Sequence, residues 1–306
     1  MNGLALAAVL RAQAELIRPH PVTAFALHSA RLDRLSGGIP ARFSEQSIAR
    51  AHNLEWVFTK NETADDVERL VGRVSSLSEA VRDLPESWAR DDAVRTQELV
   101  SRLLGLDEAM AWAERAWENI EGCRPPIHEL SEGSQGLAFL RWLLHRVLPY
   151  PCFLWDMQHV AVRFRVTETS LLEAVDRSER LRSALDESRY RGIAHDFLGT
   201  RFWRSAVEDF VWRVTEGRSS NPLAIRTQIE ALAGSSLEAV GAVQPVICLD
   251  GNYRPLAGVI EADTAVRVQP DDWPVYADQA WTTVELARDA PMLNSIVLDE
   301  DRKRIA

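Results

Sequence analysis

The sequence predicts a mainly α-helical protein, built from one or more multi-helix bundles and a small α+β unit at its C-terminal end. Two observations lead to this fold class. Apolar residues recur at three- and four-residue spacing, the period of a helix, through about the first 240 residues. After Gly241 the pattern changes to short extended runs separated by turn residues, which is typical of strands. Helix should therefore exceed half of the chain, with strands confined to the part after Gly241.

The N-terminal part reads as a series of helices that end at proline or glycine. An amphipathic helix over residues 2–17 stops before Pro19, and a second ends at the pair Gly37–Gly38. The predicted helices here are 2–17, 22–35, 44–58, one that starts after Thr63 and ends near Pro85, and two within 86–121. The loop 123–136, rich in Pro, Gly and Ser, then marks a boundary.

The central part is also helical, and the C-terminal part is mixed. Central helices are predicted over 137–148, 151–166, 169–188 and 223–232. Later, residues 245–256 read as two extended pieces around a turn at Asp250, followed by a strand at 266–268, a helix over 274–289 and a strand at 294–298. The predicted units are an acidic N-terminal bundle (1–122), a central helical unit (123–240) and a small α+β unit (241–306).

Composition and charge restrict the classes of partner. The chain has 306 residues, 46% of them hydrophobic and 26% charged, as in ordinary soluble proteins. Its net charge is −10, and residues 60–121 carry 15 acidic against 8 basic side chains. An anionic surface repels phosphate backbones and anionic lipids, so nucleic acid and membranes are not the expected partners. Three widely spaced cysteines and the lack of a long apolar span predict a cytoplasmic protein.

Residues 188–214 combine arginines, aromatic rings and one histidine more densely than any other segment. We expect five of its six aromatic side chains to be mostly buried in the central unit, because large rings are rarely left in water. These are Phe197, Phe202, Trp203, Phe210 and Trp212.

Arg189, Arg191 and His195 form a motif within this segment. Their spacing resembles the Arg-x(4–6)-His element of HEPN ribonucleases, which are all-α proteins. The resemblance implies an arginine and a histidine that act near the scissile phosphate of RNA. The sequence departs from the family where Tyr190 replaces a polar residue and where Gly192 weakens a helix. A structural or partner-binding role for His195 is the alternative that we favour.

Residues 159–177 resemble the helix-turn-helix of bacterial DNA-binding regulators. They depart from it at Arg165, where such turns usually have glycine. The second helix would present Glu168, Glu173 and Asp176, which repel phosphate groups. Packing between two ordinary helices explains the same pattern, as does a protein-binding use of it.

The sequence contains no signature of a metal, a cofactor or a catalytic nucleophile. The histidines are scattered without a second ligand at metal-binding spacing, although His159 and Asp156 lie three apart on one helix face. No Gly-Cys-Gly sequence and no GxSxG motif occurs. We therefore predict no metal site and no cofactor.

The C-terminal unit places Trp273, Tyr276 and Trp281 among aspartates. On a helix these rings fall on one side, where they would either dock the unit onto the helical body or bind a partner. We assign them as the partner-binding residues. Together these observations favour a non-catalytic regulatory or adaptor subunit of a bacterial multiprotein system that acts through protein–protein contacts. The competing hypotheses are the HEPN-like ribonuclease and the helix-turn-helix regulator.

Overall fold

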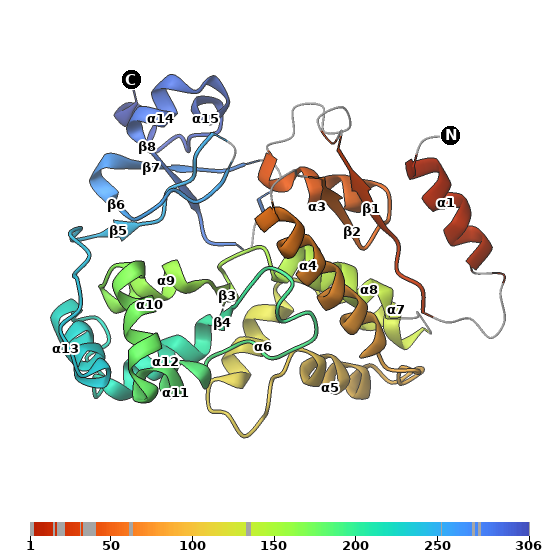
Figure 1. The fold of residues 1–306 in the computed structure, drawn as a ribbon, viewed down its shortest axis with the longest axis horizontal. Helices are drawn as coiled ribbons and strands as arrows, with labels where there is room; N and C mark the ends of the chain where they lie inside the picture. The colour runs from red at the N-terminus through yellow and green to blue at the C-terminus, as the bar shows by residue number, and fades with distance from the viewer. Residues whose placement is uncertain are drawn as a thin grey trace. The chain divides into compact units, whose positions relative to one another are not determined.

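The computed structural model describes residues 3–14, 16, 22–30, 32, 41–60, 64–132, 136–251, 253–270, 273–274 and 277–305. The fold is mainly α with small two-stranded sheets, as predicted (Figure 1). The chain forms two compact units. The first contains residues 1–110, 117–149 and 191–199, and the second contains 111–116, 150–190 and 200–306.

The first unit combines helices with one parallel pair of strands. Its elements are α1 (Gly3–Ala14), β1 (Ala26–Ser29), α3 (Ala41–Ala51), β2 (Trp56–Thr59), α4 (Ala64–Arg82), α5 (Ala93–Leu103), most of α6 (Ala113–Glu121), α7 (Ile127–Ser131), α8 (Leu137–Trp142) and a π-helical turn (Leu143–Val147). Strand β1 pairs with β2, with Ala26 opposite Trp56. Helix α3 connects the two strands and packs on β2, which gives a β-α-β arrangement.

This parallel pair corrects the sequence prediction, which assigned 22–35 and 44–58 to helices and confined strands to the region after Gly241. Residues 56–58 are all buried, so β2 is a continuous apolar run rather than an alternating one. A short run of that kind has no period that distinguishes a buried strand from a helix.

Arg73 of α4 is held among aromatic rings beside β2. Its guanidinium lies 5.1 Å from the ring centre of Trp56, 5.2 Å from that of Phe58 and 4.9 Å from that of Phe197. Burial lowers the pKa of Arg73, and Glu45, which accepts hydrogen bonds from both terminal nitrogens, offsets part of this. Glu45 also accepts from Trp56 Nε1 at 3.1 Å. These contacts fasten α4 to the strands.

Phe197 shows why residues 191–199 belong to the first unit. Its ring is fully buried and meets the Trp56 ring edge-on at 4.9 Å. Nearby, Ile193 N donates to Leu103 O at 2.7 Å. The chain therefore leaves the second unit after Tyr190 and returns to it at Thr200.

The second unit is a helical body with short antiparallel ladders. Its elements are β3 (Leu154–Trp155), α9 (Met157–Phe164), α10 (Glu168–Arg177), α11 (Glu179–Asp186), β4 (Phe202–Trp203), α12 (Arg204–Val214), α13 (Pro222–Ala233), β5 (Pro245–Val246), β6 (Ile260–Glu261), β7 (Ala265–Val268), β8 (Ala280–Thr283), α14 (Val284–Asp289) and α15 (Pro291–Ser295), with 3-10 turns at Ala262–Thr264 and Arg302–Arg304. Helices α9 to α13 surround one apolar core. The side-chain amide of Gln158 in α9 donates to Leu256 O and Gly258 O, which ties the C-terminal segment to this body.

The aromatic segment is largely buried, with one exception. Phe202, Trp203 and Phe210 are buried in the second unit, and Phe197 in the first. The prediction was wrong for Trp212, whose side chain is 58% exposed. Trp212 lies on the outer side of α12, where its ring covers Gly217. A Cβ atom placed on Gly217 would lie 3.2 Å from this ring.

The region after Gly241 confirms some of the predicted elements and corrects others. Leu249 pairs with Pro255 across the predicted turn, and β7 covers the predicted strand at 266–268. The predicted helix over 274–289 is confirmed only in its last part, as α14, and is wrong at residues 280–283, which form β8 and pair with β7. Cross-strand pairing here outweighs the local helical spacing of the rings. The predicted strand at 294–298 is reduced to one bridge, between Val268 and Val297.

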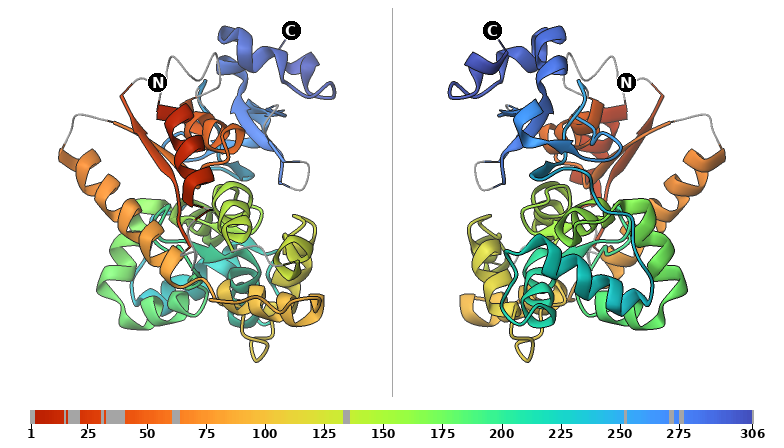
Figure 2. Two further views of the ribbon diagram at one scale, coloured as in Figure 1. Left: turned by 90° about the vertical axis from the view of Figure 1, so that its right-hand side faces the viewer. Right: turned by 90° about the vertical axis from the view of Figure 1, so that its left-hand side faces the viewer.

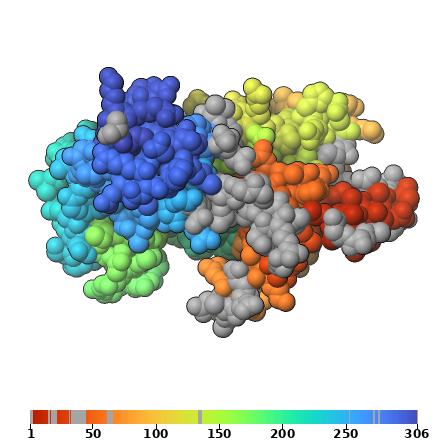
Figure 3. Space-filling model, turned by 90° about the horizontal axis from the view of Figure 1, so that it is seen from above, coloured from red at the N-terminus to blue at the C-terminus, as the bar shows by residue number. Residues whose placement is uncertain are grey.

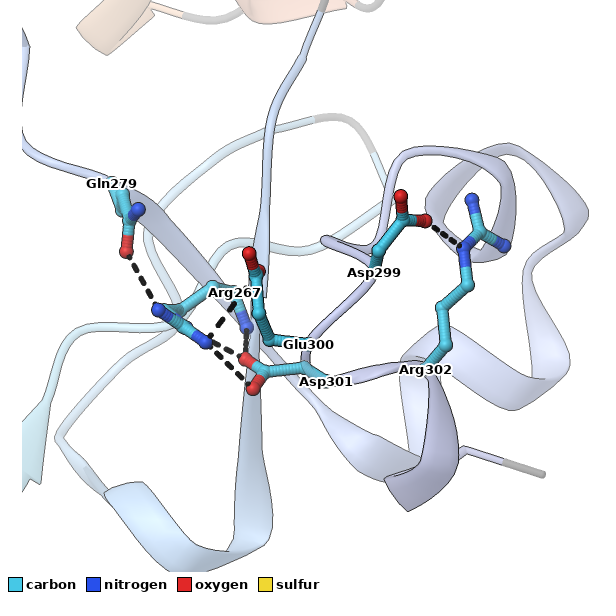
Figure 4. A network of polar contacts seen from close by, with 6 residues as sticks. All are labelled: Arg267, Gln279, Asp299, Glu300, Asp301 and Arg302. Atoms are coloured by element: carbon cyan, nitrogen blue, oxygen red, sulfur yellow. Dashed lines mark hydrogen bonds and ion pairs between the residues drawn. The ribbon is translucent and has the colours of Figure 1, made fainter.

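An ion-pair network holds the end of the chain against β7 (Figure 4). Arg267 Nε and Nη2 donate to the two carboxylate oxygens of Asp301, each at 2.9 Å, and Arg267 N donates to Asp301 at 2.8 Å. Asp301 is buried, and these hydrogen bonds hold its pKa below the ordinary value. A separate pair, Arg302 and Asp299, lies at the neighbouring turn.

The two compact units are made of segments that are distant in the sequence, and the predicted division at residues 122 and 240 stays a prediction. Residues 123–149 pack with the N-terminal helices, and residues 241–306 belong to the same unit as α9 to α13. Contacts between residues that are distant in sequence, such as Phe197 with Trp56 and Gln158 with Leu256, determine which segments pack together in one unit.

Candidate functional site

The candidate site is the outer face of helix α1. The helix lies beside β1 in the first unit (Figure 2). On its inner face, Leu4 and Ala7 pack against the small core around β2. The start of α1 packs closely on β1, because a Cβ atom placed on Gly3 would lie only 3.0 Å from Cδ1 of Leu27.

Arg11 anchors the second half of α1 to the unit. Its Nη2 lies 3.0 Å from Glu55 Oε2, and its guanidinium lies 4.8 Å from the ring centre of Phe25. The Glu55 side chain is fully buried and also accepts a hydrogen bond from Arg141 Nη1 at 3.0 Å. The charge of Arg11 is therefore neutralised beneath the helix and not presented on its outer face.

The outer face of α1 is apolar. Leu6, Val9 and Leu10 are 47%, 49% and 48% exposed, and their spacing of three and four residues places them in one patch. Gln13 is the only polar residue among the exposed positions of this helix. Figure 3 shows α1, in red, at the surface of the first unit. Contiguous exposed apolar patches of this kind commonly mark contact sites for other macromolecules.

Sequence reasoning missed this face, although a signal for it was present. The prediction treated 2–17 as an amphipathic helix, whose outer side would be polar. However, residues 3–10 contain no charged side chain, so the side opposite the packed face must be apolar too. A helix that is apolar all round and yet lies at a surface has an unpaired face.

The members of the ribonuclease-like motif are assigned to different compact units. Arg189 lies in the second unit, where it bridges to Phe202, whereas Arg191 and His195 belong to the first. Residues 188–199 form turns rather than a helix, and Ala194 has a φ of 58°. His195 is exposed, and its Nε2 lies 3.2 Å from Asp196. The helical setting that the resemblance implies is therefore missing here.

The two helices of the predicted helix-turn-helix are present as α9 and α10. Arg165 adopts the left-handed conformation, with a φ of 66°, at the place where glycine is usual. Leu171 and Ala174 of α10 are buried in the core of the second unit. The exposed side of α10 includes Glu168, Glu173 and Asp176, which gives it a negative charge.

The predicted partner-binding rings do not share a helix face. Trp273 is buried, its ring lies 5.4 Å from that of Tyr150, and its Nε1 donates to Asp278 O at 2.7 Å. Trp281 is half-buried on β8, and Tyr276 lies outside the described residues. The assignment of these three residues to partner binding stays a prediction.

No family model, curated protein or solved structure matches the chain. In the described ranges, no group of three or more His, Cys, Asp or Glu side chains is placed to hold a metal ion. None of the helices in these ranges is both long and apolar enough to cross a lipid bilayer.

Proposed function

We propose that the chain is a non-catalytic regulatory or adaptor subunit of a bacterial multiprotein system, and that it acts through protein–protein contacts. The observation that supports this proposal is the apolar outer face of α1, formed by Leu6, Val9 and Leu10. The inner face of the same helix is already anchored by Arg11, so the outer face is left for a partner.

The size of this patch fits part of an interface rather than all of it. Fully burying a leucine or valine contributes about 1.5–3 kcal/mol, so covering three half-exposed side chains contributes roughly 3 kcal/mol. A stable interface buries about 800 Å² on each partner, which is more than one short helix provides. The partner should therefore also contact surfaces next to α1.

The chemistry of the face restricts the partner to an uncharged, apolar surface such as a helix or a groove of another protein. A charged partner surface would lose its hydration against Leu6, Val9 and Leu10 without gaining an ion pair. A membrane surface fits less well, because helices that bind membranes carry many basic residues on their polar face. Here Arg11 is the only basic residue in α1, and it is paired with Glu55.

A photo-reactive amino acid placed at Val9 tests this proposal in cells of the native host. The matched control is the same amino acid at Val94, a valine on α5 that is 69% exposed. We expect a specific cross-linked protein from position 9 and not from position 94. The product is then identified by mass spectrometry and its binding is reconstituted with purified proteins. Equal products from both positions, or none from position 9, would contradict the proposal.

The ribonuclease hypothesis has its own test. Wild type and His195→Ala are incubated with single-stranded RNA and tRNA at low salt. We expect no cleavage by either protein, because the surface is anionic and residues 188–199 lack a helix. Cleavage by wild type that disappears in a correctly folded His195→Ala variant would replace the adaptor proposal.

A further inference from the structure

In the second unit, charged groups gather at the end of the β3–β4 ladder. Trp155 pairs with Phe202 in this antiparallel ladder, so Asp156 and Arg201 occupy the next opposing positions. The charges of Asp156 and Arg201 interact, because each side chain shifts the pKa of the other. Asp156 also caps α9, which begins at Met157.

Asp156 orients the imidazole of His159. Its Oδ1 accepts a hydrogen bond from His159 N at 3.0 Å and lies 2.7 Å from His159 Nδ1. Burial alone would raise the pKa of Asp156, but the hydrogen bonds and charge of His159, with a further contribution from Arg201, hold it well below the ordinary value. The carboxylate stays ionised and accepts a hydrogen bond from Nδ1, which leaves Nε2 for a ligand, with a lone pair when the ring is neutral and an N–H when it is protonated.

His159 is thereby fixed but still accessible. Its side chain is 23% exposed. In the part of the chain that the structure describes, Nε2 has no hydrogen-bond partner, since the contacts of the ring are made through Nδ1. The free nitrogen of an oriented imidazole accepts a hydrogen bond from a ligand when it is unprotonated and donates one when it is protonated.

Arg201 is half-buried and lacks the partner that comparable arginines have. Arg11, Arg73 and Arg163 each donate to a carboxylate at 3.2 Å or less. Among the described residues, Arg201 has no carboxylate oxygen within 4.0 Å, and its hydrogen bond goes from Nη1 to Thr200 O at 3.3 Å. Burial lowers its pKa, and the charge of Asp156 only partly offsets this. A guanidinium has five N–H donors, so most of them remain for an anion.

The nearby carboxylates do not prevent an anion from binding. The charge of Asp156 is already compensated by the two N–H groups of His159. Burial and the charge of Asp156 raise the pKa of Glu168 at the start of α10, while His159 acts in the opposite direction. Glu168 is therefore more easily protonated than an ordinary glutamate and can then donate a hydrogen bond to an oxyanion.

We propose that Arg201 and His159, positioned by Asp156, form a binding site for the oxyanion group of a small ligand. Arg201 supplies paired donors for two ligand oxygens, and the Nε2–H of a protonated His159 ring, whose Nδ1–H donates to Asp156, donates the third hydrogen bond. Phosphate and carboxylate groups share this chemistry. On the proposed adaptor function, the protein would then bind a small ligand here in addition to the protein partner that contacts α1.

The test is an NMR titration of the full chain, at constant ionic strength, with inorganic phosphate and separately with acetate. We expect saturable shifts of the His159 ring signals, and ring nitrogen shifts that report a proton on Nδ1. Tighter binding of phosphate indicates a phosphate-bearing ligand, and equal or tighter binding of acetate indicates a carboxylate. If neither anion moves the His159 signals, or if Nδ1 carries no proton in the bound state, the proposal is wrong.

Matched variants separate a specific site from general attraction. Arg201→Gln should weaken binding about tenfold or more, since hydrogen bonds to charged groups are lost. Arg165→Gln is the control, because Arg165 is also half-buried in the second unit and donates to the backbone at Val243 O. It should bind as wild type does. Equal affinity of Arg201→Gln and wild type would overturn the proposal, and His159→Gln checks the result if Arg201→Gln fails to fold.

Discussion

In the first unit, ionised side chains lie beneath a helix and among aromatic rings, whereas in the helical body of the second unit they lie at the rim of the core. Glu55 is fully buried and is shared by Arg11 and Arg141. The comparable pair in the second unit, Arg163 and Glu208, is bidentate, but Glu208 keeps a third of its side-chain surface in water. Burying a charge makes an element depend on its partner, while a rim pair adds little to stability. The comparison predicts how each unit responds to substitution.

The largest effect is expected at the core of the second unit. Trp203 is buried, and its ring lies 5.6 Å from that of Tyr190 and 6.1 Å from that of Trp112. Trp203→Ala should lower the free energy of unfolding by about 3–5 kcal/mol, because a large cavity remains. Chemical denaturation measures the change. A loss below about 1 kcal/mol would be inconsistent with a buried ring.

A loss of about 3 kcal/mol is expected for Glu55→Ala, because the substitution leaves Arg11 and Arg141 without their buried counter-charge. Glu208→Ala is the matched control in the second unit and should lose about 1 kcal/mol or less. Denaturant unfolding of both variants compares the two units directly. Equal losses would mean that burial of charge does not distinguish them.

An intermediate effect is expected at the C-terminal network in Figure 4. Asp301→Asn removes the charge that Arg267 binds and should destabilise the protein by about 2 kcal/mol. Since the pKa of Asp301 is lowered on folding, its contribution is fully present above the ordinary carboxyl range. It should fade as the pH falls through and below that range. A wild-type advantage over Asp301→Asn that persists unchanged in strong acid would contradict this assignment.

The smallest effect is expected at Trp212, the exposed ring of α12. Trp212→Ala should change the free energy of unfolding by about 0.5 kcal/mol or less, as is usual for exposed positions. Acrylamide should quench the fluorescence of Trp212 more than that of buried Trp203. A large loss of stability would show that this ring is covered.

The comparison also explains which parts of the fold could be predicted from sequence. In the second unit, Asn221 and Pro222 mark the start of a helix, so α13 is close to the predicted range 223–232. The helix predicted over 169–188 is also helical, but it is divided at Ser178 into α10 and α11. In the first unit, β1 and β2 have only four residues each, β2 is buried without alternation, and α3 lies between the two strands in the sequence. The spacing of apolar residues within each strand does not indicate which other strand it pairs with.

The candidate sites were less predictable than the fold. The apolar character of residues 3–10 was visible in the sequence, but which side of α1 packs inward depends on the pairing of Arg11 with Glu55, 44 residues away. Likewise, Asp156 and His159 are three residues apart and were noted together. Arg201 joins them only because β4 pairs with β3, which no local pattern indicates.

The account rests most directly on the outer face of α1, and the dissociation constant of the cross-linked partner measures its role. Val9→Asp places a charge in the centre of this face and should weaken binding about tenfold or more, because the charge is desolvated in the complex. Val94→Asp, the same substitution on α5, should leave the dissociation constant unchanged. Thermal unfolding checks that both variants are folded. Equal affinity of Val9→Asp and wild type for the partner would contradict the account.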